Sequence, residues 1–259
     1  MVLTLRLLLT PCLIASISLV ERRWGTAVSG WFMGFPLVSA PVSIVLAVAY
    51  GPAFAARSAV GTLGGLTSVC SFCLAYTLVA RKARWPLSLA GGIGAFLLVT
   101  AGWNALQWPL WPTFAVGVAA LALTLWLIPR RKLSTPPARL PAWELPARML
   151  MAAVFVWLLT ALANLLGPTL SGLLAPFPVV TSVLAPFTQR RSGAMAATQL
   201  LRGVTMGLFS FTCFYVTLSV LLPWQPLLVS YVGATIAALL VGSLALRFVA
   251  PGSVGASGK

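Results

Sequence analysis

Long apolar segments separated by short polar turns run along the whole chain. Each segment is close to the length of about 20 residues that an α-helix needs to cross the hydrocarbon core of a bilayer. None shows the alternation of apolar and polar residues over about ten positions that is typical of a membrane β-barrel. We therefore predict an all-α polytopic membrane protein with nine transmembrane helices, at 3–20, 31–50, 54–79, 86–105, 110–128, 148–166, 172–188, 194–221 and 226–249.

The composition agrees with this pattern. The 259 residues are 60% hydrophobic and 7% charged, and the mean hydropathy is +1.00. There is no histidine, and the two carboxylates, Glu21 and Glu144, fall in loops or at helix ends. These absences argue against an enzyme, a metal site or a bound cofactor, because the side chains for such chemistry are missing. We interpret the four cysteines as structural.

An internal repeat divides the chain into two similar units. Residues 29–39 (SGWFMGFPLVS) recur as residues 171–181 (SGLLAPFPVVT), an offset of 142 residues (171 − 29). The same offset pairs Ser68 with Ser210, and it pairs Gly25, Gly51, Gly61 and Gly65 with Gly167, Gly193, Gly203 and Gly207. We predict one repeat at 1–106, a linking helix with a cytoplasmic loop at 107–145, a second repeat at 146–249, and a disordered tail at 250–259. The linking helix adds one crossing, so the four-helix repeats should have inverted topology.

The basic residues provide a test of this topology. The loops after the first, third, fifth and seventh predicted helices are basic, whereas those after the fourth, sixth and eighth carry no charge. The positive-inside rule then places the amino terminus outside and the carboxyl terminus in the cytoplasm of a bacterial inner membrane. The net charge of +15 is explained by this orientation and by contact with anionic lipids, and it does not imply nucleic acid.

Prolines are expected to break the second and seventh helices at matched places. Pro36 and Pro41 interrupt one predicted helix, and Pro176, Pro178 and Pro186 interrupt its counterpart. Matched interruptions in inverted repeats indicate a transport site, and a restarting helix presents free N–H groups that suit an anion. The candidate substrate-binding residues around the breaks are Phe35, Pro36, Ser39, Ser43, Phe177, Pro178, Thr181 and Ser182. The alternative is a hinge that makes no contact with a ligand.

Two arginines fall inside predicted helices. Arg57 and Arg202 lie at similar depths in equivalent helices, and Gln199 is the aligned partner of Arg57. A buried intramembrane arginine needs a partner, a cavity or a ligand, and with no carboxylate expected nearby we predict that both bind an anionic substrate. The alternative is that backbone carbonyls at a broken helix hold them. Arg6 and Arg148, by contrast, are expected to reach the interface by snorkelling.

The pairs Gly61/Gly65 and Gly203/Gly207 are predicted to be packing devices. Small residues one turn apart allow close approach of a neighbouring helix, and we expect this neighbour to be one of the broken helices.

The repeat units resemble a known family. The pattern Gly-x-x-x-x-Phe-Pro-x-x-Ser/Thr within residues 29–76 and 167–215, followed by a loop glycine and a helix rich in small residues, is similar to the core of GlpM-type small bacterial membrane proteins. Those are about half as long, and this chain resembles two such units fused through an extra helix. The resemblance implies no established substrate and adds no catalytic residue.

Together these features predict a secondary transporter or exchanger of a small anionic solute, working by alternating access at a midplane site. Coupling to Na⁺ or protons, facilitated diffusion and exchange are all compatible with the sequence, as is a homodimer. Two alternatives of other classes are an accessory or scaffold subunit of an envelope biosynthesis system and a lipid flippase.

Overall fold

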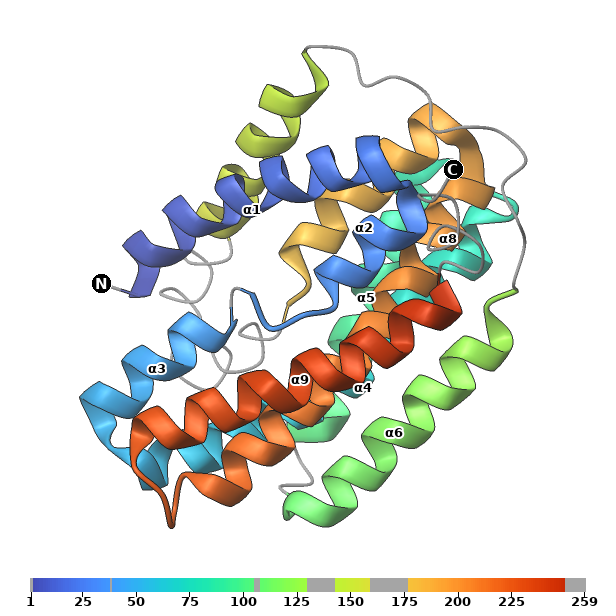
Figure 1. The fold of residues 1–259 in the computed structure, drawn as a ribbon. Coiled ribbons are helices and arrows are strands. Elements are labelled where there is room, and N and C mark those ends of the chain that lie inside the picture. Colours follow the sequence, from blue (N-terminus) through green and yellow to red (C-terminus); the bar gives the residue numbers. More distant parts are fainter. Residues whose placement is uncertain (1, 38, 105–107, 130–142, 159–176, 250–259) are drawn as a thin grey trace, which may run out of the picture.

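The computed structural model describes residues 2–37, 39–104, 108–129, 143–158 and 177–249, and all regular structure within these ranges is helical (Figure 1). The predicted tail, the end of the sixth predicted helix and the start of the seventh lie outside them, and so does Pro176. The helices are α1 (Val2–Trp24), α2 (Thr26–Met33), α3 (Ser39–Tyr50), α4 (Pro52–Ala80), α5 (Trp85–Asn104), α6 (Leu110–Leu127), α8 (Val179–Leu221) and α9 (Leu227–Val249), together with a helical stretch at 144–158.

Five of these helices have long apolar windows of membrane-spanning length: Pro52–Ala80, Trp85–Trp103, Leu110–Leu127, Val179–Leu221 and Leu227–Leu246. The described part of the chain therefore has the architecture of a helical membrane protein, as the apolar pattern predicted.

Glycines form one-residue joints between consecutive helices. Gly25 separates α1 from α2, and Gly51 separates α3 from α4, with φ values of 88° and 86°. Gly193 has φ 82° and ψ 173° and divides α8 into two helical parts. Glycine is favoured here because other residues rarely adopt a positive φ. Gly51 and Gly193 are equivalent in the repeat, so both units turn in the same way before their longest helix.

Two of the predicted proline interruptions are wrong. Pro41 lies in the first turn of α3, where its missing N–H has no intrahelical acceptor to lose. Pro186 lies within α8 and does not end it, since membrane helices tolerate proline when neighbouring groups satisfy the freed carbonyl. The break near Pro36 is present, because α2 ends at Met33 and α3 begins at Ser39. Pro178 directly precedes α8.

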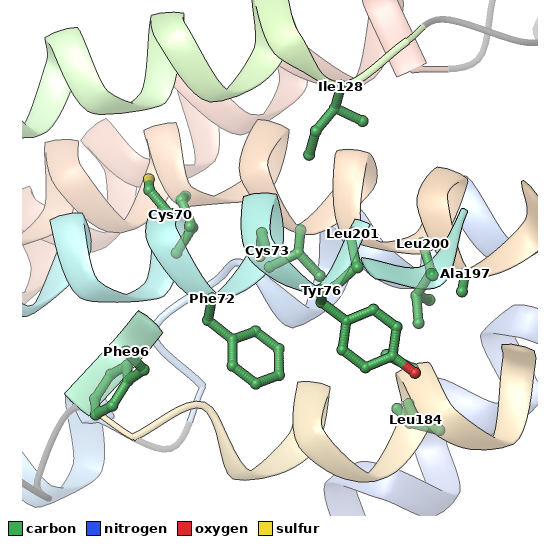
Figure 2. Packing of buried hydrophobic residues seen from close by; sticks show 14 of the residues in the cluster. Cys70, Phe72, Cys73, Tyr76, Phe96, Ile128, Leu184, Ala197, Leu200 and Leu201 are labelled. Carbon is green, nitrogen blue, oxygen red and sulfur yellow. The ribbon is translucent and has the colours of Figure 1, made fainter. Parts of the chain in front are cut away.

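The core is built around α4 and the second part of α8, which run in opposite directions. Ala55 at the start of α4 shares a buried cluster with Leu218 and Leu222 at the end of α8. At the other end of the pair, Ala80 and Ala194 line the same hollow. A larger cluster joins them in the middle and extends to the first part of α8, with Tyr76 of α4 pointing toward Leu184 and Phe72 lying between Tyr76 and Phe96 of α5 (Figure 2).

The remaining helices cover this pair. α5 packs on α4 and α9 packs on α8, while α6 contacts both members of the pair and α2 crosses α8. α1 lies at the edge of the bundle beside the helix at 144–158 (Figure 1). Ile14 of α1, Ala152 and Val183 form a small separate cluster there.

Candidate functional site

The two Phe-Pro turns have the same local structure. In the first, Leu37 N donates to Phe35 O at 2.8 Å and Ala40 N donates to Pro36 O at 2.8 Å. The second repeats both bonds, because Val179 N donates to Phe177 O and Ser182 N donates to Pro178 O, each at 2.9 Å. The sequence repeat is thus reproduced in the backbone at the candidate site.

Each turn packs against helices of the other repeat. Gly34, beside the first turn, meets the backbone of Gly207 and Leu208, near the middle of the second part of α8. The Phe35 ring occupies the space above Gly242 of α9. The Phe177 ring lies edge-on to Phe96 of α5 at 5.2 Å. Both turns therefore lie near the middle of long apolar helices, and each repeat contributes to the surroundings of the other's turn.

Gly203 and Gly207 bring α2 into backbone contact with α8. A methyl group on Gly203 would overlap the carbonyl oxygen of Ala27, and one on Gly207 would overlap that of Trp31. The predicted packing role is confirmed for this pair. At the equivalent Gly61, no atom lies within 4 Å of the position of an added methyl group.

The hydroxyl groups near the turns have different environments. Ser39 begins α3 and is partly exposed, whereas Ser43 is buried and shares a 2.8 Å hydrogen bond with the Tyr231 hydroxyl. Thr181 and Ser182 are buried in the first turn of α8. The Ser182 Oγ has no hydrogen-bond partner in the described chain.

Ser68 and Ser210 form a second pair of buried hydroxyls that the sequence-based choice of site residues left out. Both are fully buried near the middle of α4 and of the second part of α8, and neither Oγ has a partner within the described residues. The Ser210 Oγ lies beside the Phe35 ring at Gly242. The repeat offset that pairs these two serines was the signal available in the sequence.

The structure does not gather all the predicted site residues around one space. Met33 next to the first turn and Phe177 in the second both pack against the apolar cluster that contains Leu66, Val204 and Leu208. The turns are therefore bridged by apolar side chains in this conformation.

Arg57 and Arg202 lie toward opposite ends of the helix pair. Arg57 is exposed near the start of α4 and makes no ion pair within the described residues. Arg202 Nη1 donates to Leu125 O at 2.6 Å and also to Ile128 O, at the carboxyl end of α6. These contacts agree with the alternative expectation that backbone carbonyls hold Arg202. The carbonyls belong, however, to the end of α6 and not to a broken helix. Gln199, one turn away, is buried.

We expect Arg202→Gln to lower the free energy of unfolding by about 1.5–3 kcal/mol, because two carbonyl oxygens in partly buried hydrogen bonds lose a charged donor. Arg57→Gln should leave it unchanged. Chemical denaturation of the two variants in detergent tests this, and equal stability of Arg202→Gln and wild type would contradict the assigned contacts.

A cluster of four charged side chains, three of them buried, connects α1, the helix at 144–158 and α8. Arg148 is 0% exposed, and Glu21 and Glu144 are 1% and 3% exposed. Arg148 pairs with Glu21 at 2.7 Å and with Glu144 at 2.5 Å. Arg191 pairs with the same carboxylates at 2.8 and 3.0 Å. We call these four residues the charge cluster.

One expectation from the sequence is wrong at this point. Arg148 does not snorkel to the interface, because both carboxylates and Ser18 Oγ satisfy its guanidinium inside the protein. Glu21 and Glu144 lie at helix ends, as expected, near the end of α1 and at the start of the helix at 144–158, and both are buried. Thr188 Oγ1 also donates to Glu21, at 3.3 Å. Glu144 and Arg148 have the local spacing of one helical turn, but Glu21, Thr188 and Arg191 come from distant segments, so no local pattern predicted the whole charge cluster.

A basic hollow of about 440 Å³ opens near the charge cluster. It is lined by residues from the end of α4, the start of α5 and the bend of α8: Ala80, Ala83, Arg84, Trp85, Gln189, Arg190 and Ala194. Gln189 Nε2 donates to Ala83 O at 3.0 Å and connects the two sides.

Comparisons with protein-family models, with curated proteins and with solved structures give no match to this chain. The resemblance to GlpM-type proteins therefore depends on the motif residues alone.

Proposed function

We propose that the protein is a secondary transporter or exchanger of a small anionic solute in a bacterial inner membrane. In this proposal nine helices cross the membrane, and the two repeats have opposite orientations. The observation that carries the proposal is the pair of Phe-Pro turns with identical hydrogen bonding near the middle of long apolar helices. Matched interruptions of this kind form solute sites in transporters built from inverted repeats.

The antiparallel packing of equivalent helices supports the inverted arrangement. α4 and the second part of α8 are repeat partners, and their opposite directions are what a two-fold axis in the membrane plane produces. The contacts between each turn and the other repeat support this arrangement as well. The first turn contacts α8 and α9, whereas Phe177 of the second turn contacts α5.

Unpartnered hydroxyls provide the candidate donors to the solute. A buried polar group without a hydrogen bond costs about 1–3 kcal/mol, so a native site retains one only for a reason. Among the described residues, Ser68, Ser182 and Ser210 are three such groups. Ser182 follows the second turn, the Ser210 Oγ lies beside the Phe35 ring of the first, and Ser68 is the repeat partner of Ser210. We assign them to solute binding in a conformation in which the apolar cluster between the turns has separated.

The basic residues favour an anion as the solute. The chain has 17 basic and 2 acidic residues, and a positive surface raises the local concentration of anions at the entrance. Arg57 lies exposed at one end of the helix pair, where it would act on the approach of the solute and not at the turns.

The test is uptake of labelled phosphate, sulfate, acetate and gluconate into vesicles that contain the purified protein. We expect uptake of at least one of these anions above that of protein-free vesicles. In the double variant Ser68→Ala/Ser210→Ala, the initial rate of uptake, measured at an anion concentration below saturation, should fall about tenfold or more, because two hydrogen-bond donors to the anion are lost.

The same double variant should be at least as stable as wild type, since two unsatisfied hydroxyls are removed. The control is Ser243→Ala, whose exposed hydroxyl bonds only within its own helix and whose uptake should match wild type. No uptake of any of the four anions contradicts the transport proposal. Normal uptake by Ser68→Ala/Ser210→Ala contradicts the assignment of the serines.

A further inference from the structure

The basic hollow has no counter-ion among the described residues. The whole chain has only two acidic side chains, and Arg148 and Arg191 engage both of them in the charge cluster. Arg84 and Arg190, which line the hollow, form no ion pair with any described residue. Both side chains are exposed, so the two guanidinium groups are available to an anion from outside the chain.

The residue types of the hollow indicate the chemistry of that anion. Arginine presents planar pairs of N–H donors that match the oxygens of a phosphate group, and two arginines from different helices can hold one phosphate from two sides. Trp85 is partly buried at the start of α5, where tryptophan commonly marks the membrane interface. A phosphate at the level of lipid head groups fits this position.

Gln189 adds a requirement for a hydrogen-bond donor. Its side chain is more than nine-tenths buried, and its Nε2 is already used by the carbonyl of Ala83. Its Oε1 is buried and has no partner in the described chain. Gln189 also lines the hollow, so a rotation of its amide would bring Oε1 within reach of a hydroxyl group carried by the ligand. The volume of about 440 Å³ is in the range of small-molecule sites and leaves room for more than a bare phosphate.

We propose that the basic hollow binds a phosphate ester of a hydroxylated alcohol, with Arg84 and Arg190 on the phosphate and Gln189 on the hydroxyl. The ester could come from the glycerol phosphate head group of an anionic lipid or from a soluble phosphate ester. This site is separate from the Phe-Pro turns, so it does not depend on the proposed transport.

The experiment measures the Kd of two probes for the purified full chain in an uncharged detergent: short-chain phosphatidylglycerol and glycerol phosphate. Short-chain diacylglycerol, which lacks the phosphate, is the negative control. We expect Arg84→Gln/Arg190→Gln to weaken binding about 100-fold, on the basis of about tenfold for each charged hydrogen-bond donor. Ala83→Leu, which fills the hollow and keeps both charges, should weaken it as well.

The matched control is Arg22→Gln/Arg23→Gln. These two arginines are exposed at the end of α1 and lie outside the hollow, so the same loss of charge should change Kd less than about twofold if local contacts dominate. Folding of every variant is checked by circular dichroism and gel filtration.

The two probes distinguish the sources of the ligand. Binding of phosphatidylglycerol without measurable binding of glycerol phosphate supports a lipid site, and similar affinities support a soluble ester. The proposal is overturned if neither probe binds, or if Arg84→Gln/Arg190→Gln keeps the wild-type affinity for the probe that does.

Discussion

Replacing Arg148 by leucine should lower the free energy of unfolding by about 3–5 kcal/mol, the cost of removing one partner from a buried ion pair. Glu21 and Glu144 would then remain buried with Arg191 as their one arginine within the charge cluster. Chemical denaturation in detergent measures the change. Arg22→Leu, at an exposed neighbour of Glu21, should change stability by less than about 0.5 kcal/mol.

A second substitution tests whether charge balance causes the loss. In Arg148→Leu/Glu144→Gln the pair of Glu21 and Arg191 is kept and no carboxylate is left in excess. We expect this double variant to recover at least half of the stability lost in Arg148→Leu, because the excess buried charge is the main cost. If Arg148→Leu is as stable as wild type, or if Glu144→Gln deepens the loss, the charge cluster does not stabilise the fold.

Alanine at Gly203 or Gly207 should destabilise the protein by about 3 kcal/mol or more in each case. The added methyl group meets the backbone of α2, at Ala27 or Trp31, and backbone cannot move aside as a flexible side chain can. The variants should show a lower melting temperature, and the displaced α2 should also reduce uptake because α2 leads into the first Phe-Pro turn.

Gly61→Ala is the matched control, since Gly61 is the repeat partner of Gly203 in an equally apolar helix. An added methyl group there meets nothing within 4 Å, and alanine favours a helix over glycine by about 1 kcal/mol. We expect Gly61→Ala to be as stable as wild type or more so. Equal effects of Gly61→Ala and Gly203→Ala would contradict the close contact of α2 with α8.

Much of the helical architecture could be predicted from the sequence because apolar length is a local property. The predicted helices at 54–79, 86–105, 110–128, 194–221 and 226–249 differ by two residues or fewer at each end from α4, α5, α6, the second part of α8 and α9. The repeat offset predicted Gly51 and Gly193 as equivalent, and both adopt the same positive φ.

What could not be predicted depends on contacts between distant segments. The sequence shows that Arg148 lies in an apolar helix, but Glu21 and Arg191 come from helices 127 and 43 residues away (148 − 21 and 191 − 148). The contacts of Arg202 could not be predicted for the same reason. Its carbonyl partners at the end of α6 come close to it only once α6 packs on α8. A proline does not always end a helix: Pro41 lies in the first turn of α3, where no intrahelical hydrogen bond is lost, and Pro186 lies inside α8 without ending it.

The opposite orientation of the two repeats is the claim on which the transport proposal depends, and labelling of single cysteines tests it most directly. Lys82 and Trp224 are equivalent under the repeat offset (224 − 82 = 142), and both are exposed in the turns that follow α4 and α8. Lys82→Cys and Trp224→Cys would be introduced separately after the four native cysteines are replaced, and treated in intact cells with a maleimide that does not cross the membrane. We predict that Trp224→Cys reacts and Lys82→Cys reacts only after the cells are opened. Labelling of both from the same side would contradict the inverted repeats and remove the basis of the proposed transport site.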